Sequence, residues 1–306
     1  MAMTTKVYAN MLAECSGFRL DKERLRRIAD AKTLAEAFKM LADYGFSYTD
    51  GASVDEFVTG ETDALIAFVR DTAASAALEK ALLARFVYNN AKLAYKSRFH
   101  EMPRSGYYSV DFDAQKIADG DYDEADPYMR AALCELDEEK ETRPQRIDLA
   151  LTRAMYKYVL SCGASGIKKY FRAEIDMKNI LSAARKKRLK LDTEEYIHGG
   201  TISEQALDEA TRGEGFSEYF ENTPYAEFAA NIEDNGFGEL WRAERDADEY
   251  LFGLTDGAVK AFTSNTPFLN YYTSALIELK TIKTALVCIK TGVRDEIFTR
   301  LSGIYD

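Results

Sequence analysis

The chain has 306 residues, of which 46% are hydrophobic and 30% are charged, and its formal net charge is −11. Because a single hydrophobic core seldom serves a chain of this length, two or three substructures are expected. The acidic balance argues against a nucleic-acid-binding protein, whose surface would carry a basic patch.

All predicted elements are helices. Only five prolines interrupt the chain, and apolar residues such as Leu78, Leu82 and Phe86 recur near helical spacing. The helical pattern breaks in residues 101–126, which Gly120 punctuates. No convincing strand pattern occurs, so the predicted fold class is all-α. The predicted helices cover residues 5–16, 21–32, 33–44, 53–74, 76–99, 127–138, 143–161 and 165–189.

Further along the chain, three short patterns predict where helices begin. Two glycines form a turn, and the four residues from Thr201 to Glu204 then fit a capping box. In residues 222–224 and 265–267, a threonine is followed by a proline. We expect the threonine to cap a helix in each case, with the proline as the first helical residue.

The chain contains an internal repeat. Residues 170–183 recur without a gap at 272–285, an offset of 102 residues, with six identical positions. A weaker copy lies at residues 88–96, where Asn89 aligns with Asp176 at an offset of 87. Such a period is typical of helical units that stack on a shared core. We therefore expect three units, over residues 1–110, 111–215 and 216–306.

Polar residues recur within these copies. Asp176 and Asn179 lie three residues apart on the expected helix, so they are neighbours at the edge of its apolar stripe. Glu278 stands at the position of Asp176 in the later copy. A buried polar group needs a hydrogen-bond partner. We expect all three side chains to bond between helices or subdomains, in a structural role and not a catalytic one.

Motifs for catalysis and metal binding are absent from the sequence. The glycines and lysines of residues 163–169 have the wrong spacing for a phosphate-binding loop, and His100 and His198 stand too far apart to form a motif. One acidic segment begins like a calcium loop, but Glu124 and Arg130 stand where such a loop needs Gly and Glu. The sequence therefore predicts no catalytic, cofactor or metal site.

The sequence also favours a cytosolic location. Residues 1–16 lack the continuous apolar run of a signal peptide. The charge-free stretch 261–277 is interrupted by polar residues, so no membrane span is expected. The four cysteines lie far apart without a CxxC pair, which is typical of reduced thiols.

Several segments carry a family resemblance. Residues 173–180, Arg185 and residues 196–202 resemble the central signature of the C-subunit family of V/A-type ATPases, whose eukaryotic counterpart is called the d subunit. Residues 8–10 resemble the usual start of that family. The chain departs from the family at Thr281, where Asn is frequent. The segments that resemble the family's last repeat are residues 267–268, 271–272, 278–283 and 290–292.

The resemblance implies a specific architecture and role. Members of that family are funnels of three similar helical subdomains around a pseudo-threefold axis. They are non-catalytic rotor subunits on the cytoplasmic face of the membrane, and they couple the central-stalk subunits to the proteolipid ring. Rotation is linked there to proton or sodium transport during ATP hydrolysis or synthesis. Such a role implies no cofactor, no nucleic acid and no small-molecule substrate.

Two charge runs each have two interpretations. Arg185, Lys186, Lys187 and Arg188 close the central repeat helix, where cations complement the helix dipole. Alternatively, they contact ring loops or anionic lipid headgroups. The acidic run over residues 119–141 is either a solvated face or a docking surface for a basic stalk subunit.

Two other classes of protein stay in view. A generic helical-repeat adaptor that binds soluble partners would form an open superhelix with one concave face. A helical enzyme of the isoprenoid-synthase kind would need aspartate-rich motifs on facing helices to hold magnesium and diphosphate. Residues 246–249 are the nearest candidate and lack that pattern.

Overall fold

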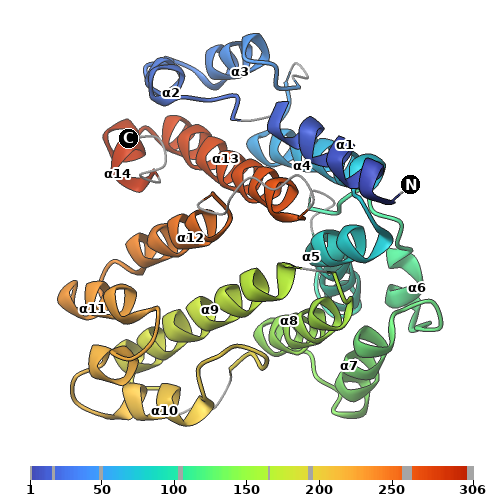
Figure 1. Cartoon of the computed structure of the whole chain (residues 1–306), viewed down its shortest axis with the longest axis vertical. Helices are drawn as coiled ribbons and strands as arrows, with labels where there is room; N and C mark the ends of the chain where they lie inside the picture. Colours follow the sequence, from blue (N-terminus) through green and yellow to red (C-terminus); the bar gives the residue numbers. More distant parts are fainter. Residues whose placement is uncertain are drawn as a thin grey trace.

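The computed structural model describes residues 2–15, 18–47, 51–102, 106–164, 166–191, 196–256 and 264–301. Within these ranges all regular secondary structure is helical (Figure 1). The prediction of an all-α fold is therefore confirmed.

The helices of the first half agree closely with the predicted ranges. Asp21, Thr33, Ser53 and Ser75 each accept a hydrogen bond from a main-chain N–H of the first turn, so each of these side chains fixes a helix start. The helices are α1 Ala2–Cys15, α2 Lys22–Ala29, α3 Leu34–Asp43, α4 Val54–Thr72, α5 Ala76–Ser97, α6 Ala114–Asp119, α7 Pro127–Glu138 and α8 Pro144–Ser161.

The second half contains two long helices and several short ones. The longest of the described helices, α13, ends at Thr291 and is capped by Gly292, whose φ of 79° lies in the left-handed region that suits glycine. The elements are α9 Ile167–Leu189, α10 Glu204–Arg212, η1 Ser217–Phe220, α11 Ala226–Asp234, α12 Leu240–Asp256, α13 Thr266–Thr291, η2 Arg294–Glu296 and α14 Ile297–Arg300.

Several local predictions were wrong. The short helix α6 lies in a segment that we expected to be irregular; Asp113 caps it. Ser203, not Thr201, caps α10, because the amide and hydroxyl of Thr201 donate to a buried carboxylate instead. Helix α11 has Tyr225 as its N-cap residue, and Thr223 donates to the preceding turn. The helix α13 already includes Thr266, with the preceding asparagine at the N-cap position.

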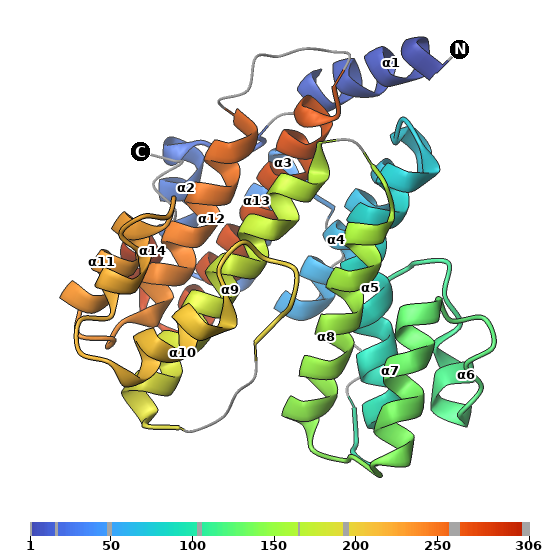
Figure 2. The same ribbon diagram turned by 60° about the horizontal axis from the view of Figure 1, so that its bottom comes forward.

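Six helices pack pairwise in a closed cycle. Along the chain α4 packs on α5, α8 on α9, and α12 on α13. Between these pairs α5 packs on α8, α9 on α12, and α13 on α4, which completes the cycle. Figure 1 shows α13, α12 and α9 following one another on one side, with α5 and α8 on the other. Figure 2 shows α6 and α7 placed outside α5 and α8.

The apolar interior forms two clusters. The larger one extends from α1 to the first half of α13 and includes the fully buried Tyr88, Tyr156 and Tyr272. The smaller one joins α2, α3 and the start of α4 to the second half of α13, through residues such as Phe38 and Leu286. The first and last parts of the chain therefore share a core. The boundaries at residues 110 and 215 stay a prediction.

No helix in the described part of the chain combines the length and the apolar character needed to cross a bilayer.

Candidate interaction groove

Two asparagines fix their following loops with the same pair of hydrogen bonds. Asn179 donates from Nδ2 to the carbonyl of Ile197 (2.8 Å) and accepts from its N–H (2.9 Å). Asn90 bonds in the same way to Tyr108, at 2.8 and 2.9 Å. In both cases the partner lies 18 residues further along the chain. Asn90 therefore corresponds to Asn179, and the predicted offset of 87 residues for the first copy was wrong by two.

Asp176 is fully buried and holds a loop through its carboxylate. It accepts hydrogen bonds from the N–H (2.8 Å) and the hydroxyl (2.6 Å) of Thr201, and from the N–H of Ile202 (3.1 Å). The hydroxyl of Tyr225 donates to it at 2.9 Å. A Cβ atom on Gly200 would stand 2.1 Å from Asp176 Oδ1, so only glycine fits beside this carboxylate.

Glu278 repeats this arrangement with a loop from the other end of the chain. It accepts from the consecutive N–H groups of Arg19 (2.8 Å) and Leu20 (2.9 Å), directly before the residue that caps α2. Asp176 likewise binds the two amides directly before the residue that caps α10. Burial raises the pKa of Glu278, although the two amides and the guanidinium of Arg19 oppose that shift. The two carboxylates thus share one role.

A large open groove of about 740 Å³ lies inside the helix cycle. Its walls come from two pairs of consecutive helices, α8 with α9 and α12 with α13, and the two pairs are distant in sequence. Its lining residues are Gln145, Asp148, Leu149, Thr152, Glu174, Met177, Lys178, Leu181, Ser182, Arg185, Ile197, Glu244, Ala247, Asp248, Leu251 and Lys280.

Ion pairs between different helices stiffen the walls of this groove. The four carboxylates that line it each face a cation, and burial raises the pKa of Asp248, which Lys280 opposes. Three of these contacts cross-link helices that are neighbours in the cycle, and the fourth, Arg85–Glu174, joins α5 to α9 across α8. The pairs are Arg85–Glu174 (3.2 Å), Lys96–Asp148 (2.9 Å), Arg185–Glu244 and Lys280–Asp248.

Two lysines at the groove contact no carboxylate in the described part of the chain. Lys178 lines the groove from α9 with an exposed side chain. Lys92, on α5, donates from Nζ to the hydroxyl of Thr152 (2.6 Å). Burial lowers the pKa of Lys92 to about 8; the carboxylate of Asp148 opposes this shift, and the nearby charges of Lys178 and Lys96 add to it.

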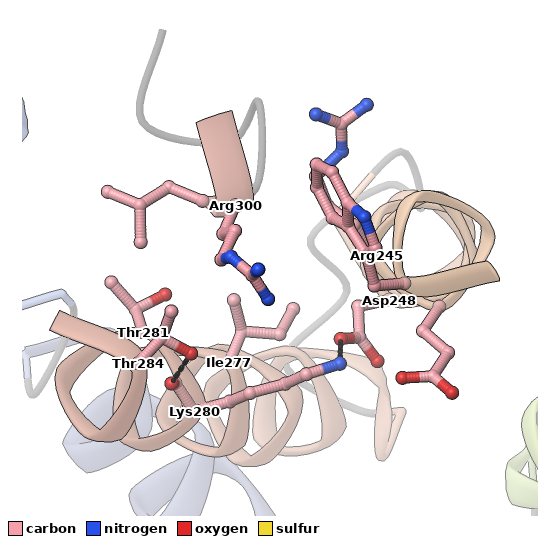
Figure 3. A pocket seen from close by; sticks show the side chains of 10 residues that line it. Arg245, Asp248, Ile277, Lys280, Thr281, Thr284 and Arg300 are labelled. Carbon is pink, nitrogen blue, oxygen red and sulfur yellow. Dashed lines mark hydrogen bonds and ion pairs between the residues drawn. The ribbon is translucent and has the colours of Figure 1, made fainter. Parts of the chain in front are cut away.

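A smaller pocket of about 190 Å³ lies behind one wall of the groove, between α12, α13 and α14. Figure 3 shows Lys280 extending along α13 to Asp248, with Arg300 on the far side of the pocket. Lys280 and Asp248 line both hollows, so their ion pair forms part of the partition between them. The guanidinium of Arg300 lies 5.4 Å from the ring centre of Trp241, a cation–π contact.

The basic residues 185–188 at the end of α9 make contacts with other parts of the chain. Lys186 is buried, with its ammonium 3.7 Å from the ring centre of Tyr196. Lys187 donates to main-chain carbonyls at the end of α10, and Arg188 donates to one that precedes α12. Arg185 pairs with a carboxylate of α12. Only Arg185 and Arg188 are exposed, and the interface role of the run stays a prediction.

Some carboxylates of the acidic run, residues 119–141, also make hydrogen bonds within the chain. Asp126 caps α7 and accepts from the hydroxyl of Tyr88. Asp137 accepts from the hydroxyls of Tyr95 and Tyr122. Its role as a docking surface stays a prediction. In the described residues no group of three or more His, Cys, Asp or Glu side chains could hold a metal ion.

Of the residues that line the groove, the sequence singled out Arg185 as an interface candidate and missed most of the others. Lys178 and Lys280 are identical in the two repeat copies, which was the available signal for them. Arg85, Lys92 and Asp248 gave no such signal, because their importance depends on helices that are far apart in sequence. The three polar residues that the sequence singled out lie on the repeat helices and hold loops. Of these three, none lines the groove.

These features define an all-α protein built from a repeated unit, in which a long helix fixes the loop that leads to a short one. The chain belongs to the ATP synthase (C/AC39) subunit family, whose model matches residues 15–300. This match confirms the resemblance to the C and d subunits of V/A-type ATPases, which implies membership of a rotary ATPase complex. None of the curated proteins compared with the chain matches it.

Proposed function

We propose that the chain is a non-catalytic rotor subunit of a V/A-type rotary ATPase. It couples the central stalk to the membrane proteolipid ring during proton or sodium transport linked to ATP hydrolysis or synthesis. The observation that carries this proposal is the family match over residues 15–300. In this role the protein lies at the cytoplasmic face of the membrane, held there by the ring or by lipid headgroups.

A coupler of rotation must resist twisting, and the packing supports that role. The closed cycle of six helices leaves no free end that could unroll under load. Arg85 and Glu174 join α5 to α9 across two repeat copies. Arg19 bridges Glu61 on α4 (3.0 Å) and Glu278 on α13 (3.3 Å), which ties the start of the chain to its last long helix.

The proposal includes three similar subdomains around a pseudo-threefold axis, which form a funnel. Shared hydrogen bonds at Asn90 and Asn179 support two of the units, and those at Asp176 and Glu278 support the second and third. The foot of the central stalk enters the groove inside the helix cycle. Of the basic run, the exposed Arg185 and Arg188 are the candidates for contact with the ring or the headgroups.

The test is a tagged pull-down from gently solubilised native membranes, followed by mass spectrometry. Recovery of a proteolipid together with central-stalk subunits, in stoichiometric amounts, is the expected result. A clean monomer, or a set of unrelated soluble proteins, would contradict the proposal and favour the helical-repeat adaptor.

A further inference from the structure

The groove has an uneven distribution of charge. Each carboxylate that lines it is already paired with a cation from another helix. Lys178 and Lys92 are the cations left over in the described residues around it. The lining itself holds four carboxylates and three cations. With the three cations of α5 that bond to it, Arg85, Lys92 and Lys96, six cations face these four carboxylates, so two positive charges are left over.

Lys178 differs in this respect from its counterpart in the later repeat copy. Lys280 occupies the equivalent position on α13 and pairs with Asp248 on α12. The charge of Lys178 also acts on Asp248, but that carboxylate is already bonded to Lys280. On the other side Thr152 of α8 lines the groove, and it accepts from Lys92. The repeat thus keeps the lysine in both copies but supplies a bonded carboxylate for only one.

Lys92 places a second cation behind the first. Its Nζ donates the 2.6 Å hydrogen bond to Thr152, and its charge is repelled by that of Lys178, which the carboxylate of Asp148 offsets only in part. Neighbouring charges of one sign in a partly desolvated site are unfavourable unless an opposite charge joins them. A carboxylate that entered the groove would relieve this repulsion.

We propose that the groove recognises an acidic side chain, Asp or Glu, of a central-stalk subunit, and that Lys178 forms the ion pair with Lys92 in support. This inference rests on the proposed function, since it names the chemistry by which the stalk is recognised. The apolar Met177 and Leu181 stand on either side of Lys178 along α9 and also line the groove.

The first experiment repeats the membrane pull-down with charge variants of the full chain. Lys178→Glu should reduce the recovered stalk subunits about tenfold or more, since like charges across an interface are strongly unfavourable. Lys178→Arg keeps the charge and should recover them at close to the wild-type level. Lys168→Glu is the matched control, because Lys168 lies exposed on the same helix outside the groove lining.

The second experiment treats the captured wild-type complex with a carbodiimide, which joins an amine directly to a carboxylate in contact with it. The expected product is a cross-link from Lys178 or Lys92 to an acidic residue of a stalk subunit. Unchanged recovery with Lys178→Glu, together with the absence of that cross-link, would overturn the inference and leave the proposed function standing. Failure of the wild-type chain to capture any stalk subunit would overturn both.

Circular dichroism and thermal unfolding of each variant separate loss of recognition from loss of folding. Lys178 is exposed on α9, so its substitution should leave the helical signal and the unfolding temperature unchanged. If Lys178→Glu unfolds, the cross-link and the recovery of stalk subunits with Lys178→Arg still test the inference. A cross-link confined to other lysines would then contradict the inference.

Discussion

Asn90 on α5 and Asn179 on α9 make the same two hydrogen bonds, each to the main chain of the residue 18 positions later. Each side chain uses both its amide group and its carbonyl oxygen, and each is almost completely buried. The repeat is therefore a unit of helix and loop, and its asparagine fixes where the loop runs.

Replacing either asparagine by alanine should destabilise the protein. Asn90→Ala or Asn179→Ala removes two hydrogen bonds and leaves a loop N–H and C=O without partners, at a cost of about 2–3 kcal/mol. The measurement is the free energy of unfolding in urea. Asn235→Ala is the matched control, because Asn235 is exposed and bonds only within its own turn. Equal effects at all three positions would contradict the assigned role.

A pair of glycine substitutions tests the packing around Asp176. Gly200→Ala should destabilise the chain by about 1–3 kcal/mol, since the new Cβ meets the carboxylate of Asp176. Gly253 lies exposed in α12, and apart from the adjacent backbone of its own helix no atom stands within 4 Å of the position that a methyl group would occupy there. Gly253→Ala should therefore stabilise the chain by about 0.5–1 kcal/mol. Thermal unfolding of the two variants should shift in opposite directions. If both variants raised the unfolding temperature, the side chain of Asp176 would be able to move aside for the new methyl group without cost.

The ion pair between Arg85 and Glu174 is suited to a double-mutant cycle. Arg85→Met leaves the carboxylate of Glu174 largely buried without its cation, which should cost about 2–4 kcal/mol. Glu174→Met in the same background should restore part of that loss, because the unpaired charge is gone. Urea unfolding of the two single variants and the double variant gives the coupling energy, expected to be about 1–3 kcal/mol.

The exposed pair between Glu23 and Arg27, one turn apart on α2, is the control for that cycle. Its coupling energy should stay below about 0.5 kcal/mol, since both side chains are well solvated. If Arg85 and Glu174 were coupled no more strongly than this surface pair, the cross-link between α5 and α9 would have no mechanical importance.

The sequence predicted the helices well because their signals are local. Periodic apolar residues, proline positions and capping side chains such as Ser53 all act within one or two turns. The predictions at Thr201 and Thr223 failed because each residue found a partner outside the helix it was expected to cap. Local patterns cannot anticipate such competition, since the competing group lies elsewhere in the chain.

The candidate site was predictable only in part, for a related reason. The repeat identified Asp176 and Glu278 as equivalent, and both hold loops. The loop that Glu278 holds begins 259 residues earlier at Arg19, a distance along the chain that no pattern reveals. The groove depends on four helices and on which charges remain unpaired after they pack. That property belongs to the assembled cycle and not to any one segment.

The pH dependence of stability should reveal the unfavourable environment of the Lys92 ammonium. Burial, with Lys96 and Lys178 nearby, lowers its pKa from 10.5 to about 8, and the carboxylate of Asp148 opposes this only in part. Between about pH 8 and 10.5 the unfolded chain keeps this proton and the folded chain has lost it. Since stability rises with pH wherever the unfolded state binds more protons, this group stabilises the fold progressively across that window.

Lys92→Met should therefore stabilise the isolated subunit at pH 7, by about 2 kcal/mol, since each unit of pKa shift corresponds to about 1.4 kcal/mol and the hydrogen bond to Thr152 is lost. At pH 10.5 the gain should largely disappear, because the wild-type lysine is then neutral in the folded state. Urea unfolding at the two pH values measures the difference. A variant that is less stable than wild type at pH 7 would show that the ammonium is well solvated, and the groove would then lack the excess charge that the recognition of an acidic partner requires.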